Sequence, residues 1–464
     1  MKRKGHAGDS PGAPGGAPHR HVAVTFTGNV IAFIAAMAGG MITARVLGPA
    51  GRGTFALLHT TPDLIVSFVL LGIIQTNVCF VSNGMLPAGR ALAVSARAAL
   101  LQTLAGLAVF AVFVLGFRGQ FFGDSSGRMI LLAAALVPLG ILQAHWSSIM
   151  SALRLFGRLA VIRALAPVLL AALYAILLVW LGLGVGGGIA AVVASTLIVT
   201  ALMLLAIRQQ RDPDGASGGD GGALCEGFWK RYLSYGIKLH ASALVWYLII
   251  RIDIYMIKSI LDIESVGFYS LASSLAEKLW LVSASANTVL LPSLAAVADP
   301  VERARLAAKA ARQLTVVLLP FFLLGAVLGR PLVVLLYGAE FEPATLPFII
   351  LLGSTLMQAH RSMTASFFES SNLALVNVAT RIAAFALKVA LNLLLIPALL
   401  MEGAALASLA AYSFEWLIGT GVFLRRTGLR WREAIPGPGD LAAVRTKTGD
   451  LLGAVLPWPR RPGA

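Results

Sequence analysis

The sequence predicts an all-α polytopic membrane protein with about 12 transmembrane helices. The 464 residues are 58% hydrophobic and 12% charged, whereas soluble domains carry about 25% charged residues. Apolar runs of about 20 residues, the length that a bilayer core requires, recur along the chain. Lys and Arg gather in short segments between these runs, which is a topology signal and not a nucleic-acid footprint. We therefore expect membrane lipids, and no nucleic acid, around this protein.

The apolar runs divide the chain into two halves of six predicted helices. Residues 1–22 are rich in Gly and Pro and predict a disordered leader. The N-terminal half, 23–207, and the C-terminal half, 231–424, are joined by a Gly-rich linker at 208–230, and a basic tail follows at 425–464. The predicted helices start near Val24, Thr54, Ala98, Met129, Val161, Gly188, Gly236, Gly267, Leu314, Ala344, Ile382 and Gly403.

The distribution of Lys and Arg predicts the orientation. If both termini are cytoplasmic, the cytoplasmic segments hold 27 of these residues and the opposite loops hold 6. The positive-inside rule therefore favours a multi-pass protein of the inner membrane with a cytoplasmic N-terminus and a cytoplasmic C-terminus.

Two short matches indicate an internal repeat. The segment QAHWS at 143–147 recurs as QAHRS at 358–362, an offset of 215 residues. The segment GTFAL at 53–57 resembles GFYSL at 267–271, an offset of 214 residues. Because the offset spans six helices, the two halves should share one orientation and be related by an axis along the membrane normal, as in secondary transporters.

The segment ARVLGPAGRG, residues 44–53, resembles the signature of polysaccharide and O-antigen flippases. These lipid-linked oligosaccharide flippases belong to the multidrug/oligosaccharidyl-lipid/polysaccharide exporter superfamily. The second half carries a similar pattern in RID at 251–253, VGFY at 266–269 and LP at 291–292. Arg52 departs from the pattern, because relatives more often have an aromatic residue before the glycine.

The resemblance implies two six-helix lobes around a central cavity. It also implies that a polyprenyl-pyrophosphate-linked glycan moves from the cytoplasmic to the outer leaflet, with polysaccharide-assembly proteins as partners. It implies no cofactor, metal or catalytic residue. In such relatives the first and eighth helices flank a lateral portal.

Six charged residues fall inside the predicted helices. A charge at mid-bilayer costs roughly 2.5 to 3.5 kcal/mol or more, so each should face the bundle interior or a wet cavity. Lipid carriers bear pyrophosphate, which Arg and Lys bind by charge-assisted hydrogen bonds. The sequence therefore predicts the basic members as substrate contacts and the acidic members as sites for a coupling proton or sodium ion. The basic members are Arg251, Lys278 and Lys388, and the acidic members are Asp63, Asp253 and Glu277.

Helical spacing adds further candidates. Asn377, Arg381, Lys388 and Asn392 form one polar stripe, so Arg381 joins the predicted substrate contacts, as does Arg45 at a helix end. A second predicted stripe comprises His59, Asp63, Ser67 and Asn77. The alternative is structural: the six charges cancel formally and pair across helices, and Arg45 snorkels.

Other functions stay open at this point. A drug/cation antiporter of the same superfamily would prefer an acidic cavity without Arg251 and Lys388. A membrane O-antigen ligase or polymerase would tend to have a sizeable outer loop with His, Arg or carboxylate chemistry, whereas the predicted outer loops are short. The sequence has no GxxxxGK[ST] segment, which argues against direct ATP hydrolysis. Transport of a lipid-linked glycan is the favoured function.

Overall fold

The computed structural model describes residues 18–82, 88–123, 125–209, 228–371 and 373–441, and these residues form helices without a strand. The α-helices are α1 (Pro18–Val69), α2 (Ile73–Ser82), α3 (Ala88–Phe121), α4 (Gly127–Ala152), α5 (Phe156–Tyr174), α6 (Gly184–Arg208), α7 (Phe228–Ile260), α8 (Ile263–Ala276), α9 (Trp280–Ala296), α10 (Pro300–Tyr337), α11 (Thr345–Ser370), α12 (Ala374–Thr427) and α13 (Trp431–Ala434). The short helical segments are the π-helix η1 (Ala175–Trp180) and the 3₁₀-helices η2 (Glu277–Leu279) and η3 (Ala339–Ala344).

The described helices account for the 12 predicted spans. Eight stretches are long and apolar enough to cross a membrane. Two of these, α1 and α12, each contain a non-helical residue, Gly48 and Leu400, that divides them into two segments. The helices α7 and α11, with 33 and 26 residues, complete the set. The prediction of an all-α membrane protein with about 12 helices is confirmed.

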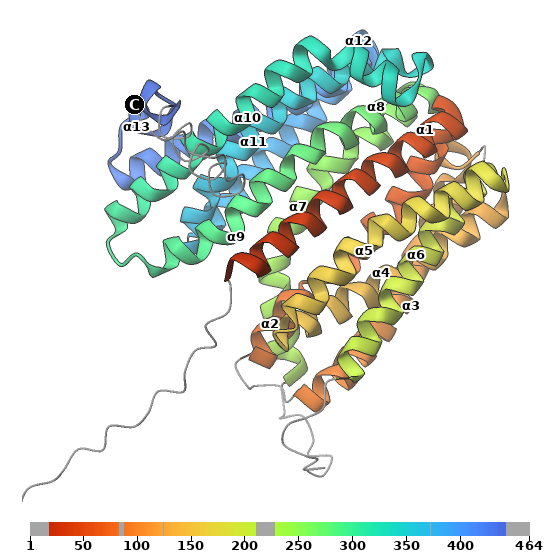
Figure 1. Cartoon of the computed structure of the whole chain (residues 1–464), viewed down its shortest axis with the longest axis horizontal. Helices are drawn as coiled ribbons and strands as arrows, with labels where there is room; N and C mark the ends of the chain where they lie inside the picture. Colours follow the sequence, from red (N-terminus) through yellow and green to blue (C-terminus); the bar gives the residue numbers. More distant parts are fainter. Residues whose placement is uncertain (1–17, 83–87, 124, 210–227, 372, 442–464) are drawn as a thin grey trace, which may run out of the picture.

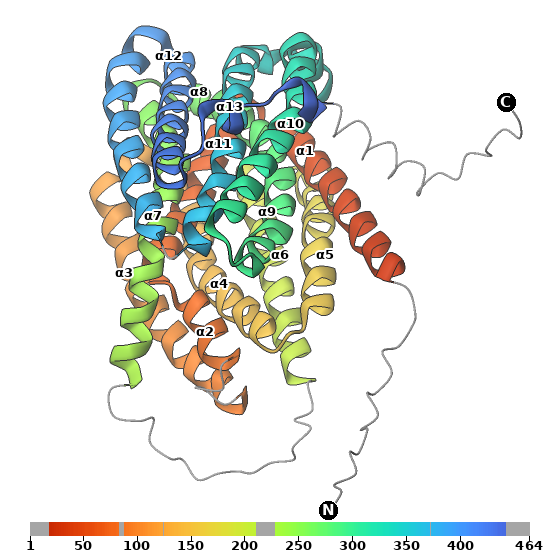
Figure 2. The ribbon, with the colours of Figure 1, turned by 90° about the vertical axis from the view of Figure 1, so that its left-hand side faces the viewer.

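The helices form two lobes (Figure 1). The helices α2 to α6 gather on one side and α8 to α13 on the other, while α1 runs between the two groups. Extensive contacts join α1 to α5 within the N-terminal lobe and α1 to α8 across the lobes. We call the end of the bundle at which α1 bends, near Gly48, the Gly48 end, and the opposite end, where α6 finishes, the Arg208 end. At the Arg208 end the first turns of α1 stand apart from neighbouring helices (Figure 2).

Several helices are longer than a bilayer requires, which places basic residues beyond the apolar core. The helix α10 starts at Pro300, fourteen residues before the predicted start, because Asp299 caps it by accepting hydrogen bonds from the Val301 and Glu302 amides. Its first turns carry Arg303 and the other basic residues of that segment. The predicted start near Leu314 marks only where the apolar run begins.

The predicted polar stripe of the second span is interrupted. Leu71 and Gly72 have positive φ angles, 46° and 72°, so α2 begins on a new helical phase. Asn77 therefore does not share a face with His59. Its side chain is buried in the N-terminal lobe, where it bonds Ser148 at 2.9 Å and Ser95 at 3.2 Å. The prediction that these four residues share one face was wrong for Asn77, because it assumed one continuous helix and the backbone turns at Leu71 and Gly72.

The repeat-related histidines have corresponding structural roles. His145 Nε2 lies 2.8 Å from the Gln102 side chain on α3, and His360 Nδ1 lies 3.1 Å from the Thr315 hydroxyl on α10. Both imidazoles are buried. Each therefore joins a central helix of its lobe to the preceding span.

Candidate functional site

A cavity of about 300 Å³ lies between the two lobes. Its lining comes from α1 and α5 of one lobe and from α7, α8, η2 and α10 of the other. The lining includes three cationic residues, Arg52, Arg251 and Lys278, and no carboxylate among the described residues. Several hydroxyl groups, including those of Ser270 and Tyr174, add hydrogen-bonding capacity. We call this space the inter-lobe cavity.

Arg251 and Glu277 form a bidentate ion pair at the inter-lobe cavity. Arg251 Nη1 and Nη2 donate to the two carboxylate oxygens of Glu277 at 2.8 and 3.2 Å. The sequence predicted separate roles for these residues, substrate binding for Arg251 and ion coupling for Glu277. The structure joins them, so that most of the charge of Arg251 is neutralised within the protein.

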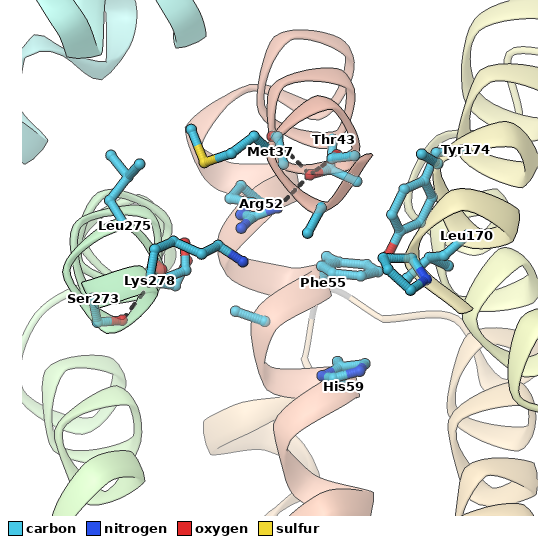
Figure 3. A pocket seen from close by; sticks show the side chains of 18 of the residues that line it. Met37, Thr43, Arg52, Phe55, His59, Leu170, Tyr174, Ser273, Leu275 and Lys278 are labelled. Atoms are coloured by element: carbon cyan, nitrogen blue, oxygen red, sulfur yellow. Dashed lines mark hydrogen bonds between the residues drawn. The ribbon is translucent and has the colours of Figure 1, made fainter. Parts of the chain in front are cut away.

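Lys278 and Arg52 leave the inter-lobe cavity positively charged. The Lys278 side chain extends from η2 toward α1, where Arg52 lies (Figure 3). The described residues give Lys278 no salt bridge, and Arg52 donates through Nη1 to the Thr43 hydroxyl. The buried Nε of Arg52 has no hydrogen-bond partner among them. Two cations with unused donors favour an anion between them.

Arg52 is a candidate site residue that sequence reasoning missed. Its position in the signature, where relatives more often have an aromatic residue, was the available signal. The kink at Gly48 turns the chain back, so that Arg52 lies on the first turns of the second segment of α1 and reaches Thr43 on the first.

A second groove of about 460 Å³ adjoins the inter-lobe cavity. It is lined by α1, α5, η2 and α9, and its mainly apolar lining, with side chains such as Phe33 and Leu281, also includes the charged residues Arg163 and Glu277. Ala36 and Lys278 line both this groove and the inter-lobe cavity. We call it the lateral groove. It places an apolar surface directly beside a cation.

Lys388 and Asp253 lie within the C-terminal lobe, away from the lining of the inter-lobe cavity. Lys388 Nζ lies 2.8 Å from Asp253 Oδ2 and donates to the Ile249 carbonyl, and the Lys388 and Asp253 side chains are 1% and 2% exposed. The Asp253 carboxylate also accepts from three further residues: Asn392 at 2.7 Å, Ser408 at 3.1 Å, and Tyr269. We call this group the Lys388 cage. The Asp253 carboxylate is therefore paired with a cation of the protein itself, the Lys388 ammonium.

Arg381 also faces the interior of the C-terminal lobe. Its Nε lies 3.6 Å from Glu415, which lies 3.7 Å from the buried Arg361. Its guanidinium stacks over the Trp246 ring at 5.4 Å. The predicted stripe of α12 therefore avoids lipid as expected, but it packs inside its own lobe.

The remaining two candidates lie at the edges of the site. Asp63 pairs with His59 at 3.5 Å, and its side chain is 49% exposed. Arg45 is exposed at the Gly48 end and donates to the carbonyls of Leu335 and Leu336 on α10. Of the three predicted coupling acids, Asp63 is the one for which the described residues provide no salt bridge to Lys or Arg. Arg45 joins the two lobes and does not line the inter-lobe cavity.

The fold is that of transporters of the MOP superfamily. A lipid II flippase MurJ in an inward closed conformation matches with a TM-score of 0.71 at 12% identity, over 93% of this chain and 92% of that chain. An inward-facing multidrug resistance MATE family transporter matches with a TM-score of 0.63 at 14% identity, over 87% of this chain and 100% of that one. A MOP superfamily transporter from Pyrococcus furiosus matches with a TM-score of 0.62 at 13% identity, over 88% and 95%.

The chain belongs to the polysaccharide biosynthesis protein family, whose model matches residues 19–297. No curated protein sequence matches it. The predicted membership of the MOP superfamily, the two six-helix lobes and a role among its flippases and transporters are confirmed.

Proposed function

We propose that this protein flips a polyprenyl-diphosphate-linked glycan precursor across the cytoplasmic membrane by alternating access, for the export of cell-surface polysaccharide. One observation carries the proposal: Lys278 borders both the polar inter-lobe cavity and the apolar lateral groove. A substrate that fits both spaces is an amphiphile with an anionic head. The proposed activity is transport, and no residue is assigned to catalysis.

The inter-lobe cavity suits a diphosphate head group. Arg52 and Lys278 face a common space, and Arg251 is the third cation of the lining. Charge-assisted hydrogen bonds from Arg and Lys to phosphate oxygens are shorter and stronger than neutral ones. A drug/cation antiporter needs the opposite polarity, and the described lining contributes no carboxylate to attract a cation.

The lateral groove suits the polyprenyl chain. Its α1 wall includes Ala32 and Ala36, whose small side chains leave room beside α9. An apolar tail in this groove would keep its contact with the bilayer while the diphosphate enters the inter-lobe cavity. Lys278, at the junction, is the residue expected to meet the diphosphate.

Binding of a short prenyl diphosphate tests this proposal without any glycan. Purified protein in detergent is expected to bind geranylgeranyl diphosphate and to show much weaker binding of geranylgeraniol. Replacing Lys278 with methionine should weaken binding of the diphosphate roughly ten-fold or more, because one charged hydrogen bond is lost. Lys278→Arg should retain most of it. Equal affinity for the diphosphate and the alcohol, measured by tryptophan fluorescence, would overturn the proposal.

The proposed orientation places the Arg208 end in the cytoplasm and the Gly48 end outside. Its support is the charge count of 27 against 6, together with the long basic start of α10. The proposed halves remain 23–207 and 231–424. Residues 1–17 of the leader, 210–227 of the linker and 442–464 of the tail lie outside the described residues.

Reporter fusions test the orientation. A phosphatase fused after Gly222 or after Arg432 is expected to be inactive, since both positions are proposed to be cytoplasmic. A green fluorescent protein fused at the same positions is expected to be bright. A fusion after Gly182, in the short connection between α5 and α6, is the matched control and should give the reverse pattern. Phosphatase activity at either proposed cytoplasmic position would contradict the proposed orientation.

A further inference from the structure

The two glycines that the internal repeat relates, Gly53 and Gly267, meet where α1 crosses α8. A Cβ atom added to Gly53 would lie 2.0 Å from the carbonyl oxygen of Ile263. A Cβ atom added to Gly267 would lie 2.0 Å from the carbonyl oxygen of Pro49. Because carbon and oxygen in Cα–H···O contacts lie about 3.3 to 3.6 Å apart, any side chain here would push the helices apart by roughly 1 Å or more.

The contact is reciprocal. Pro49 and Ile263 each start a helical segment, directly after the kink at Gly48 and after the Asp262 cap. Each glycine lies four residues into its segment and touches the first residue of the other segment. The offset of 214 residues relates both pairs, so the pseudo-two-fold axis between the lobes passes through this contact. We call it the glycine contact.

Two further bonds between the lobes lie at the same end of the bundle, whereas the bond between His240 Nε2 on α7 and the Ser67 carbonyl on α1, at 2.6 Å, lies toward the Arg208 end. Gln120, at the end of α3, donates to the Ser259 hydroxyl at the end of α7 at 3.0 Å. Arg45 on α1 donates to the last carbonyls of α10, at 2.6 Å for Leu335. At the Arg208 end, the lateral groove separates α1 from α9, and no contact as extensive as that of α1 with α8 joins them in the described part of the chain.

We infer that the glycine contact is the gate that closes the inter-lobe cavity at the Gly48 end, and that it separates when the cavity opens there. This end is the outer one under the orientation proposed above. Helix backbones that touch without interdigitating side chains can separate and return without repacking, which suits a gate. The inference explains why both segments that resemble the family signature place glycine here, a feature that substrate binding does not require.

Cross-linking across the gate provides the test. In a background with Cys79→Ala and Cys225→Ser, the pair Gln120→Cys and Ser259→Cys replaces two hydrogen-bonded, exposed side chains from opposite lobes. A short, membrane-impermeant bis-methanethiosulfonate should link this pair efficiently in intact cells. Adding Gly53→Ala or Gly267→Ala should reduce the linked fraction several-fold, because the closed gate becomes strained.

Matched glycine variants control for the effect of alanine itself. Gly116 on α3 and Gly421 on α12 have open space where a Cβ atom would be added, so Gly116→Ala and Gly421→Ala should leave the linked fraction unchanged. At Gly403 an added Cβ atom would instead lie 2.2 Å from the Leu395 carbonyl oxygen, in the segment of α12 that precedes the break at Leu400, so Gly403→Ala should lower thermal stability without reducing cross-linking of the folded fraction. Wild-type linking in folded Gly53→Ala and Gly267→Ala protein would overturn the inference.

A second measurement keeps the wild-type glycines. If the gate must open during transport, the linked protein should export no glycan, and a reductant should restore export. Export at the unlinked rate by fully linked protein would overturn the inference even if the alanine variants failed to fold. Because the linking yield is read on the protein itself and does not require transport, failure of the proposed function leaves the first readout intact.

Discussion

Replacing Lys388 with methionine is expected to lower the free energy of unfolding by about 3 to 5 kcal/mol, because removal of one partner leaves the buried Asp253 carboxylate uncompensated. Asp253 would keep hydrogen bonds from Asn392 and Ser408, but the compensating positive charge would be gone. The double variant Lys388→Met/Asp253→Asn should recover much of this loss, since no buried charge then remains. Thermal unfolding of purified protein in detergent measures both the loss of stability in Lys388→Met and its recovery in the double variant.

The same experiment separates a structural from a substrate role of Lys388. If Lys388 contacted the diphosphate instead, Lys388→Met would leave stability almost unchanged and would weaken binding of geranylgeranyl diphosphate. Arg330→Met is a suitable control, because its partner Glu342 is exposed and the pair contributes little. Equal stability of wild type and Lys388→Met would contradict the stabilising role of the Lys388 cage.

Removing Arg52 and Lys278, the two cations of the inter-lobe cavity that have no salt bridge among the described residues, should abolish transport. The double variant Arg52→Met/Lys278→Met leaves Arg251, already paired with Glu277, as the remaining cation of the described lining. Two charge-assisted hydrogen bonds are worth about 3 to 6 kcal/mol, so the flipping rate at limiting substrate should fall about a hundred-fold or more. Stability should change much less than in Lys388→Met, because no carboxylate loses its partner.

The spans could be predicted because they depend on local chemistry. Runs of about 20 apolar residues define helices in a bilayer whatever they pack against. The match of GTFAL at 53–57 with GFYSL at 267–271 contains two glycines, Gly53 and Gly267, that the structure brings into contact. The reason for the contact was not predictable, since it depends on how closely two helix axes approach.

The sequence could not predict whether a polar stripe faces the inside of its own lobe or the cavity between the lobes. Hydropathy shows that the stripe with Arg381 and Lys388 avoids lipid, but the inside of a lobe and the cavity between lobes satisfy this requirement equally. Partners decide between them: Asp253 on α7 and Glu415 on α12 hold these two cations inside the C-terminal lobe. Lys278 has no salt bridge to a carboxylate among the described residues, because η2 directs Glu277 toward Arg251 and Lys278 toward α1.

Flipping by purified protein in lipid vesicles tests the central claim most directly. Wild-type protein should move a fluorescent polyprenyl-diphosphate saccharide between leaflets, as measured by its accessibility to an added reductant. Wild-type protein should not move the same saccharide on an uncharged polyprenyl alcohol. The variant Arg52→Met/Lys278→Met should be inactive, whereas the control Arg330→Met should be active. Equal flipping of the charged and uncharged carriers, or wild-type rates in Arg52→Met/Lys278→Met, would contradict transport through an anion site in the inter-lobe cavity.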